Sequence, residues 1–203
     1  GKPLQTIESE TPEPKGKEVL LKITHSGVCH SDVHIHDGYF DLGGGNKLPV
    51  GEMLNLPHTM GHEIEGEVVA IGPDVTDVEI GANVVAYPWI GCGECATCKA
   101  GDEHYCNAPR QLGIQLPGGF ADYCIVPDSK YVLDYSGIRP GLAATYMCSG
   151  LTAFGALKKF VNINDDDHIL IMGLGGVGMM GLQFARALFD CKILAADIDP
   201  NKF

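Results

Sequence analysis

One segment late in the chain predicts a strand, a turn and a helix in direct succession: HILIMGLGGVGMMGLQFARAL, residues 168–188. The apolar run 169–172 has the length of a buried strand. Three glycines follow in the pattern G-x-G-x-x-G, and apolar residues then recur at helical spacing. These residues are Met179, Leu182, Ala185 and Phe189. A second apolar run, KILAADID at 192–199, completes the pattern of a βαβ unit with a parallel sheet.

The glycines make this βαβ unit a candidate dinucleotide-binding site. A strand precedes them, a helix follows, and Asp197 lies 19 residues after Gly178, which together form a specific fingerprint. The glycines permit a tight turn and a close approach of the backbone to pyrophosphate, and the helix N-terminus faces that anion. The alternative is a plain strand, turn and helix with Asp197 at the surface. The expected cofactor-binding residues of the turn are Gly173, Gly175, Gly176, Val177 and Gly178.

The acidic residue indicates which dinucleotide the unit would bind. We expect Asp197 to accept hydrogen bonds from the adenosine ribose hydroxyls. Its negative charge would also repel a 2′-phosphate. The sequence therefore favours NAD over NADP.

The preceding residues predict a separate, β-rich domain over 1–149. Candidate strands are EVLLKITH (18–25), IEGEVVAIG (64–72), ANVVAYP (82–88) and ADYCIVP (121–127). Alternating polar and apolar residues in EGEVVAIG, with turn formers beside them, fit a sheet with one covered face. Residues 37–59 predict a long loop, which either borders a substrate pocket or is a surface excursion. The expected fold class is α/β with a β-rich domain, and the second domain covers 150–203.

The bulk composition is that of an ordinary globular protein of one large or two small domains. The chain has 203 residues, of which 45% are hydrophobic, and a formal net charge of −12. This charge disfavours binding to nucleic acid or to an anionic membrane. No apolar run approaches the roughly 20 residues of a membrane span, and no cleavable signal peptide is visible. We expect a cytoplasmic protein, in which disulfides are rare.

Half of the eight cysteines lie in one short segment, GCGECATCKAGDEHYC at 91–106. The spacing is C-x2-C-x2-C-x7-C on a loop with three glycines, which allows all four thiolates to point at one ion. Zinc suits four thiolates best. The gap of seven residues before the last cysteine does not match bacterial ferredoxin spacing. Two disulfides, free thiols and an iron–sulfur cluster are the alternatives. The four residues are Cys92, Cys95, Cys98 and Cys106.

Three further metal-binding side chains, Cys29, His62 and Cys148, lie far apart in the sequence. They occur in GVCHSDVH, GHE and MCSGLTAFG. Two cysteines and one histidine form a catalytic zinc set that leaves a fourth position open. Spacing alone does not select these three, because a lone cysteine is more often a buried apolar residue.

Four motifs in order carry a resemblance to a known family. They are GVCHSD (27–32), GHE (61–63), the four-cysteine segment and GLGGVG (173–178). Together they resemble the zinc-dependent medium-chain alcohol dehydrogenases along nearly the whole chain. The resemblance implies a GroES-like catalytic domain over 1–149 with a structural zinc lobe at 91–107. The first part of an NAD-binding Rossmann domain would then follow over 150–203.

The resemblance also implies two zinc ions per chain and assigns their surroundings. Cys29, His62 and Cys148 would hold a catalytic zinc, and the four clustered cysteines a structural zinc. Glu63 matches a glutamate beside the catalytic zinc that approaches it when water leaves. Asp32 matches the carboxylate that orients the ligand histidine, which fixes its tautomer.

Further residues match positions around the substrate and the nicotinamide. Ser31 and His34 match a proton relay, and Thr152 matches a position beside the nicotinamide. Trp89 and Cys148 would line the alcohol site. The alternatives are that His34 is a solvated loop histidine and that Trp89 is a core aromatic residue.

The implied activity is reversible hydride transfer between an alcohol and NAD. DGYFDLGGG, YPWIGCGEC and YMCSGLTA look most like the subgroup with 6-hydroxyhexanoate dehydrogenases. That subgroup implies a primary ω-hydroxy acid, and a broader range of alcohols is the more cautious reading. Family members are commonly dimers or tetramers, so a homodimer or homotetramer is expected.

Two other functions are alternatives for a chain with this resemblance. One is a zinc-independent reductase such as a quinone reductase, which the intact Cys29, His62 and Cys148 argue against. The other is a structural zinc module or inactive fragment. The chain stops at Phe203, just after the second Rossmann strand, so we expect it to be part of a longer chain.

Overall fold

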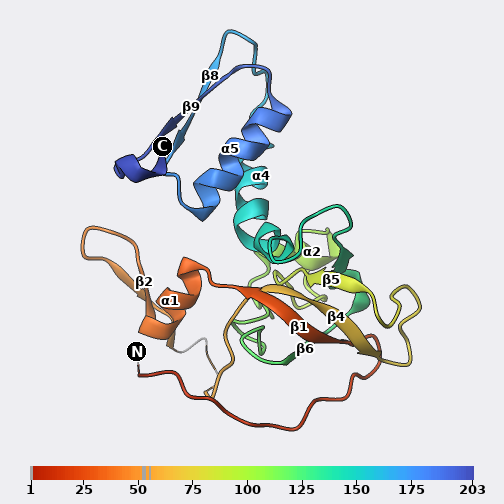
Figure 1. The fold of residues 1–203 in the computed structure, drawn as a ribbon. Helices are drawn as coiled ribbons and strands as arrows, with labels where there is room; N and C mark the ends of the chain where they lie inside the picture. Colours follow the sequence, from red (N-terminus) through yellow and green to blue (C-terminus); the bar gives the residue numbers. More distant parts are fainter. Residues whose placement is uncertain (1, 52–53, 55) are drawn as a thin grey trace. The chain divides into compact units, whose positions relative to one another are not determined.

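Backbone contacts divide the chain into two structural units (Figure 1). The computed structural model describes residues 2–51, 54 and 56–203. The first unit is Gly1–Met147 and the second is Cys148–Phe203. This division lies two residues before the predicted boundary at 149/150.

The first unit is built on one five-stranded antiparallel sheet with the order β6-β1-β4-β5-β7. The strands are β1 (Val19–Gly27), β4 (Glu63–Ile71), β5 (Asn83–Ala86), β6 (Tyr123–Val126) and β7 (Val132–Asp134). Four of them coincide with predicted strands, and β7 was not predicted. The predicted β-rich domain is confirmed for this unit.

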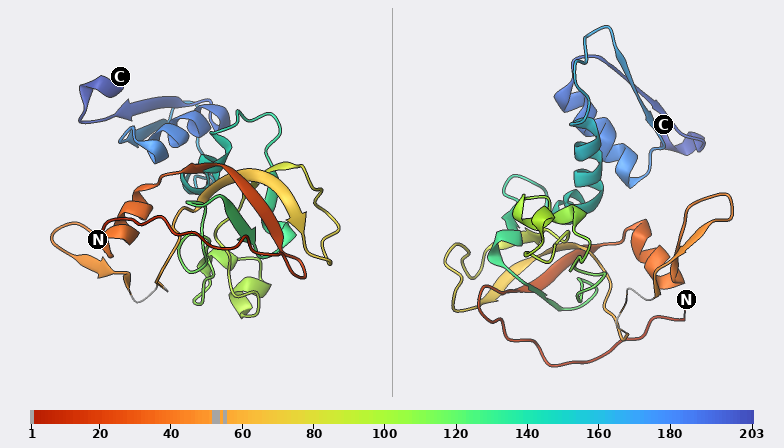
Figure 2. Two further views of the ribbon diagram at one scale, coloured as in Figure 1. Left: turned by 60° about the horizontal axis from the view of Figure 1, so that its bottom comes forward. Right: turned by 180° about the vertical axis from the view of Figure 1, so that it is seen from behind.

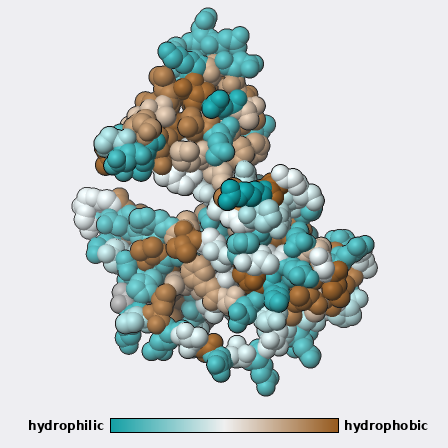
Figure 3. All heavy atoms as spheres, in the orientation of Figure 1, coloured by the Kyte–Doolittle hydropathy of each residue, from teal (hydrophilic) through white to brown (hydrophobic). Residues whose placement is uncertain are grey.

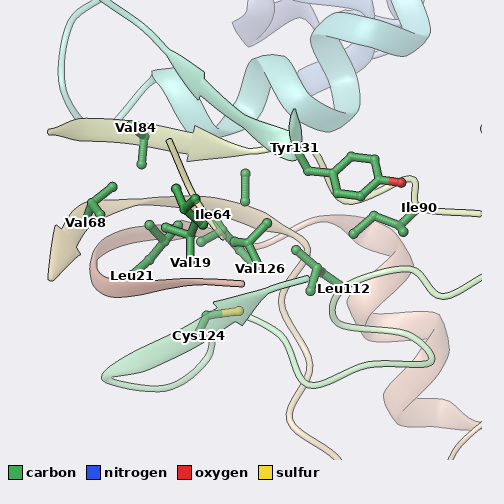
Figure 4. Close-up of a cluster of buried hydrophobic side chains, with 12 residues drawn as sticks. Val19, Leu21, Ile64, Val68, Val84, Ile90, Leu112, Cys124, Val126 and Tyr131 are labelled. Carbon is green, nitrogen blue, oxygen red and sulfur yellow. The ribbon is translucent and has the colours of Figure 1, made fainter. Parts of the chain in front are cut away.

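Apolar side chains from neighbouring strands fill the core of the first unit (Figure 4). Leu21 on β1 pairs with Val68 of β4 and with Cys124 of β6. Directly paired residues project from the same face of a sheet, so the three side chains form one buried layer. A fully buried Leu or Val contributes roughly 1.5–3 kcal/mol. This layer therefore fixes the register of β1 against β4, on which the site described below depends.

The segment between the first two predicted strands is more ordered than the sequence suggested. Residues His30–Asp37 form helix α1, which ends at Gly38 in the left-handed conformation with φ 86°. The predicted loop 37–59 contains a hairpin of β2 (Tyr39–Asp41) and β3 (Lys47–Pro49). The hairpin is seen beside α1 in both views of Figure 2, and α1 contacts β2. The prediction of one long loop was wrong for this stretch, because the short elements lack hydrophobic periodicity.

The remaining elements of the first unit are short. They are α2 (Ala96–Lys99), η2 (Glu103–Tyr105), η3 (Ser129–Tyr131) and α3 (Ala143–Thr145). The first two lie within the four-cysteine segment, and α3 contacts β4. A π-helical turn, η4 (Tyr146–Gly150), then leads from the first unit into the second.

The second unit contains the predicted βαβ arrangement. Its elements are α4 (Leu151–Leu157), β8 (His168–Met172), α5 (Gly176–Leu188), β9 (Lys192–Ala196) and η5 (Pro200–Lys202). Strands β8 and β9 are parallel, with Ile169 opposite Ile193, and α5 contacts both strands and α4. This topology confirms the expected first part of a Rossmann fold.

The two-stranded sheet of the second unit buries only one of its faces. Ile169 is buried, whereas Leu170, Met172 and Leu194 are 51%, 80% and 40% exposed. Apolar surface of this kind is visible on the second unit in Figure 3. Among the described helices, none is long and apolar enough to cross a membrane.

Candidate metal centres and cofactor turn

The four clustered cysteines converge in the first unit. Their Sγ atoms all lie within 4.8 Å of one another. Cys95 Sγ lies 3.5 Å from that of Cys98 and 3.8 Å from that of Cys106, and the Sγ atoms of Cys92 and Cys98 are 3.9 Å apart. A tetrahedral site with Zn–S distances of about 2.3 Å places its sulfurs about 3.8 Å apart. The sulfurs are free and too distant for disulfides, which require about 2.05 Å.

Backbone N–H groups of the same loop donate to these sulfurs. Cys95 N–H donates to Cys92 Sγ and Cys98 N–H to Cys95 Sγ, both at 3.4 Å. Such bonds lower the pKa of Cys95 and lower that of Cys92 to about 6. Burial instead raises the pKa of Cys98 to about 12. The loop therefore supports thiolate charge, while a buried member needs a cation to become ionised.

A glutamate inside the four-cysteine segment anchors it to η3, the short helix just before β7. Glu103 accepts hydrogen bonds from Lys130 Nζ at 2.6 Å and from the Tyr131 hydroxyl. Its other donor is the Gly91 N–H at 3.3 Å. Burial raises the pKa of Glu103, but the bonds to Lys130, Tyr131 and Gly91 outweigh it and lower the pKa overall. Sequence reasoning missed this anchor, because nothing local pairs residue 103 with residues 130–131.

A second group of metal-binding side chains lies where α1 begins and β4 begins. One ligand atom each from Cys29, His62 and Glu63 lies within 4.8 Å of the others. His62 is fully buried and Glu63 is almost so. Gly27 pairs with Glu63 in the sheet, and a Cβ there would lie 2.0 Å from the Glu63 carboxylate. Gly27 therefore makes room for the glutamate, a role that sequence reasoning did not assign.

Asp32 connects two members of this group. Its Oδ2 accepts the Cys29 N–H at 2.9 Å, while the Cys29 sulfur accepts the Asp32 N–H, which completes a capping box at the start of α1. Its Oδ1 lies 3.2 Å from His62 Nδ1 and accepts the Gly61 N–H at 3.3 Å. A carboxylate at Nδ1 favours the proton on that nitrogen, which makes Nε2 the ring nitrogen that would ligate a metal ion.

The electrostatics around His62 favour positive charge in the group. Burial lowers the pKa of His62, but hydrogen bonds to Asp32 and to the Cys29 sulfur raise it to about 9. Three anionic or potentially anionic groups, Asp32, Cys29 and Glu63, surround one imidazole in a buried place. Such a group of donors fits a divalent cation, which would replace the imidazole proton.

Trp89 connects His62 to the segment that precedes Cys148. The Trp89 and His62 ring centroids are 5.6 Å apart. The indole Nε1–H donates to the Met147 carbonyl at 2.8 Å. Cys148 is the next residue after Met147 and the first residue of the second unit. The indole therefore has a definite partner, which is what a half-buried tryptophan requires.

The predicted relay residues share helix α1. Ser31 and His34 are three positions apart, so they lie on neighbouring parts of one helical surface. The His34 ring lies 5.0 Å from Phe40 and 4.7 Å from His30 between centroids. It is half-buried on a helix, so it is not a solvated loop histidine. Within the described residues, no hydrogen bond joins Ser31 directly to His34.

The predicted dinucleotide turn connects β8 to α5 in the second unit. Gly173 has φ 88°, Gly175 is the N-cap of α5, and Gly176 begins the helix. No atom lies within 4 Å of a Cβ built at these three glycines, so the turn is open for a ligand. A Cβ at Gly178 would lie 1.7 Å from the Gly173 carbonyl, so this glycine permits close packing of helix and strand. Val177 is 49% exposed beside them.

Asp197 follows β9 and lies at this turn. Its Oδ2 accepts the Leu174 N–H at 2.6 Å and contacts Lys202 Nζ at 3.0 Å, and its Oδ1 accepts the Asp199 N–H at 2.9 Å. The N–H groups of Asp199 and Leu174, with Lys202, lower the pKa of Asp197 to about 2. A carboxylate has about four acceptor positions, of which these donors occupy three, and the Asp197 side chain is 4% exposed. Thr152 is exposed on α4 of the same unit.

A family model confirms the resemblance drawn from the four motifs. Residues 15–137, more than half of the chain, match the alcohol dehydrogenase GroES-like domain. The chain therefore belongs to the zinc-dependent medium-chain alcohol dehydrogenase family.

Individual relatives agree with this family. The chain is 40% identical over 200 residues to the NAD-dependent alcohol dehydrogenase of Saccharolobus solfataricus. The aligned residues make up 98% of this chain and 56% of the relative. The D-arabinose dehydrogenase from Sulfolobus solfataricus has a TM-score of 0.84 at 27% identity, covering 96% of this chain and 58% of that one. The cobalt- and zinc-bound thermostable alcohol dehydrogenase from Pyrobaculum aerophilum has a TM-score of 0.78 at 29% identity, covering 98% and 56%. This chain thus spans little more than half the length of these relatives.

Proposed function

We propose that the protein is a zinc-dependent alcohol dehydrogenase that transfers hydride reversibly between an alcohol and NAD. The observation that carries the proposal is the buried group of Cys29, His62 and Glu63, in which Asp32 orients the histidine. A structural zinc site has four protein ligands, whereas two cysteines and one histidine would leave a fourth position for a substrate oxygen. The dinucleotide turn in the second unit of the same chain would bind NAD, which is the hydride acceptor.

The proposed catalytic zinc ligands are Cys29, His62 and Cys148. The chain connection supports Cys148, because Met147 is held by Trp89, whose ring lies beside His62. A single peptide bond then separates Cys148 from that anchored carbonyl. Glu63, whose carboxylate lies within 4.8 Å of the Cys29 and His62 ligand atoms, would be a neighbouring carboxylate for the bound zinc. The four clustered cysteines would hold a second, structural zinc, since their sulfur spacing fits one tetrahedral ion.

The chain's own residues would bind the alcohol and move its proton. A zinc ion held by these residues would lower the pKa of the alcohol oxygen, and bound NAD would accept the hydride. The Ser31 hydroxyl would take the alcohol proton and pass it toward His34, with a ribose hydroxyl of the cofactor between them. Trp89 would form part of the alcohol-binding wall, because its indole N–H already has a partner and only its apolar ring remains free.

The proposed cofactor contacts follow from the turn and from Asp197. The open N-terminus of α5 would receive the pyrophosphate through the backbone of residues 173–178. Asp197, held at the turn by the Leu174 N–H, would bind the adenosine ribose and disfavour a 2′-phosphate. Thr152 would contact the nicotinamide. The relative from Saccharolobus solfataricus is named as NAD-dependent, which supports the same choice.

The finer proposal concerns the substrate, a primary ω-hydroxy acid such as 6-hydroxyhexanoate. Its support is the resemblance of three motifs to that subgroup. One of the similar solved structures is a D-arabinose dehydrogenase, so sugars should be included among the substrates tested. We further propose a cytoplasmic homodimer or homotetramer, as is common in the family.

One experiment on the full-length protein tests the proposal. Zinc per chain is measured by elemental analysis, and NADH formation is followed with simple primary alcohols, 6-hydroxyhexanoate and D-arabinose. We expect about two zinc ions per chain and NAD-dependent oxidation that Cys29→Ser abolishes. Cys124→Ala is the matched control, because Cys124 lies in the core outside both metal groups. Zinc in the four-cysteine lobe alone, without NADH formation, would identify a structural zinc module instead.

A further inference from the structure

A buried glutamate outside the proposed ligand set has unusual surroundings. Glu65 lies on β4, three residues after His62, and its exposure is 0%. A buried carboxylate is strongly destabilising unless its oxygens are hydrogen-bonded. Glu67, two residues further along the same strand, is exposed. Glu67 therefore faces solvent, whereas Glu65 must be stabilised by contacts inside the unit.

The contacts of Glu65 come from two other segments. The Tyr135 hydroxyl donates to Oε1 at 3.1 Å, and the Gly141 N–H donates to both oxygens at 3.0 Å. On the other side, Nδ1 of His25 on β1 lies 3.2 Å from Oε1. One side chain thus joins β1, β4 and the segment that follows β7.

A β-bulge in β1 determines which residue of that strand lies opposite Glu65. The pairing of β1 with β4 is irregular between Ile23 and His25, so Gly66 pairs with Ile23 and Glu65 with His25. The unpaired Thr24 donates its hydroxyl to the Glu65 carbonyl at 3.2 Å. Glu65 keeps the regular alternation of β4, so it lies on the face opposite Ile64 and Val68 of the core. Its burial comes from the segment after β7, which bonds to its carboxylate.

The segment bonded to Glu65 leads directly to the proposed metal ligand. Tyr135 begins a turn that follows β7 and is closed by the Ile138 N–H, and Gly141 lies in the next turn, which the Leu142 N–H closes. The chain then continues into α3, where Ala143 and Ala144 are buried and α3 contacts β4. Met147 comes next, with its carbonyl bonded to Trp89. Glu65 and Trp89 therefore fix this segment at both ends, immediately before Cys148.

We propose that Glu65 is a positioning residue for the catalytic zinc. Through Tyr135 and Gly141, it holds the segment that carries Cys148 against the strand that carries His62 and Glu63. The inference rests on the proposed function, since it takes Cys148 as a ligand. Ligands drawn from separate segments must be held within about 0.5 Å of their working geometry, which a direct bond between those segments provides.

The test compares four variants of the full-length protein: Glu65→Ala, Glu65→Gln, Tyr135→Phe and, as matched control, the exposed Glu67→Ala. Zinc per chain is measured after dialysis against a chelator. Alkylation of each cysteine by iodoacetamide is mapped by mass spectrometry. The cysteine map separates the two metal groups, because a bound zinc protects its own thiolates.

We expect Glu65→Ala to release the catalytic zinc alone. Its affinity should fall about 10- to 100-fold, as for other residues that support metal ligands, and Cys29 and Cys148 should become alkylated while the four lobe cysteines stay protected. Glu65→Gln should lose less, because its amide oxygen still accepts the Gly141 N–H. Tyr135→Phe should have a smaller effect in the same direction, and Glu67→Ala none.

Several results would overturn the inference. One is wild-type zinc content and protection in Glu65→Ala. Another is equal loss of protection in both metal groups, which would show a general structural role. If Glu65→Ala does not fold, unchanged alkylation in both Glu65→Gln and Tyr135→Phe would decide against it. A wild-type protein in which Cys29 and Cys148 are never protected would overturn the proposed function, and this inference with it.

Discussion

The two metal groups of the first unit differ in how the chain builds them. The four-cysteine lobe draws all its sulfurs from residues 92–106, and N–H groups of the same loop donate to those sulfurs. The second group takes Cys29 from the N-cap of α1 and His62 from the residue before β4. Its geometry therefore depends on sheet register, on Asp32 and on Gly27. The comparison teaches that the first group is a local property of one loop, whereas the second is a property of the fold.

The largest effect is expected from a substitution that disrupts the group of Cys29, His62 and Glu63 and leaves the four-cysteine lobe intact. His62→Ala removes a fully buried, proposed zinc ligand, so the proposed catalytic zinc should be lost. Turnover should fall by more than the roughly 100-fold that accompanies loss of a supporting residue. About one zinc per chain should remain in the lobe, measured by elemental analysis. Loss of both zinc ions would contradict the independence of the two groups.

The reciprocal change breaks the lobe. Cys92→Ser removes one of four thiolates, so the structural zinc should be released and the unit should lose stability, because structural zinc contributes folding free energy. We expect a lower Tm in thermal unfolding, by about 2–4 °C for each kcal/mol lost. At low temperature the alcohol dehydrogenase activity should persist. An inactive but folded variant with its catalytic zinc in place would show that the groups are coupled.

A smaller effect separates the two tasks of Asp32. Asn can still cap α1, but it does not bring a negative charge to His62 Nδ1. Asp32→Asn should therefore weaken catalytic zinc about 10- to 100-fold, measured by competition with a chelator. Asp32→Ala should also lose the cap, at about 0.5–2 kcal/mol of stability. Equal zinc affinity in the wild type and Asp32→Asn would remove Asp32 from the metal group.

The smallest effect concerns the anchor of the lobe and its dependence on pH. The pKa of Glu103 is lowered in the fold, so its bonds stabilise the fold above the carboxyl's ordinary pKa and this stability is lost as the pH falls through the lowered value. Glu103→Gln should cost about 1–3 kcal/mol at neutral pH. In urea unfolding, the difference from wild type should shrink in acid below about pH 4. A difference that stays constant with pH would exclude a contribution from the carboxylate charge.

The sequence predicted most of what is local and little of what is not. Cysteine spacing pointed to the lobe, and the glycine pattern with Asp197 pointed to the βαβ unit. Cys29 and His62 were found only through a resemblance, because spacing carries no information about contacts between α1 and β4. Glu65 escaped notice because it lies on the face of β4 away from the core, and its burial depends on contacts with Tyr135 and Gly141, 70 and 76 residues away in sequence. Helix α1 escaped notice too, although Cys29, Asp32 and Gly38 mark its two ends in hindsight.

Asp32 contacts both Cys29 and His62, and this has a consequence for the order in which a newly made chain acquires its metals. Asp32 can orient His62 only after α1 and β4 have come together, so a pre-organised catalytic site exists only in the folded unit. The lobe needs nothing beyond its own loop to bring its sulfurs together. Zinc should therefore enter the lobe early, even on a nascent chain, and the catalytic position last. Cells short of zinc would then accumulate protein that is folded, half loaded and inactive.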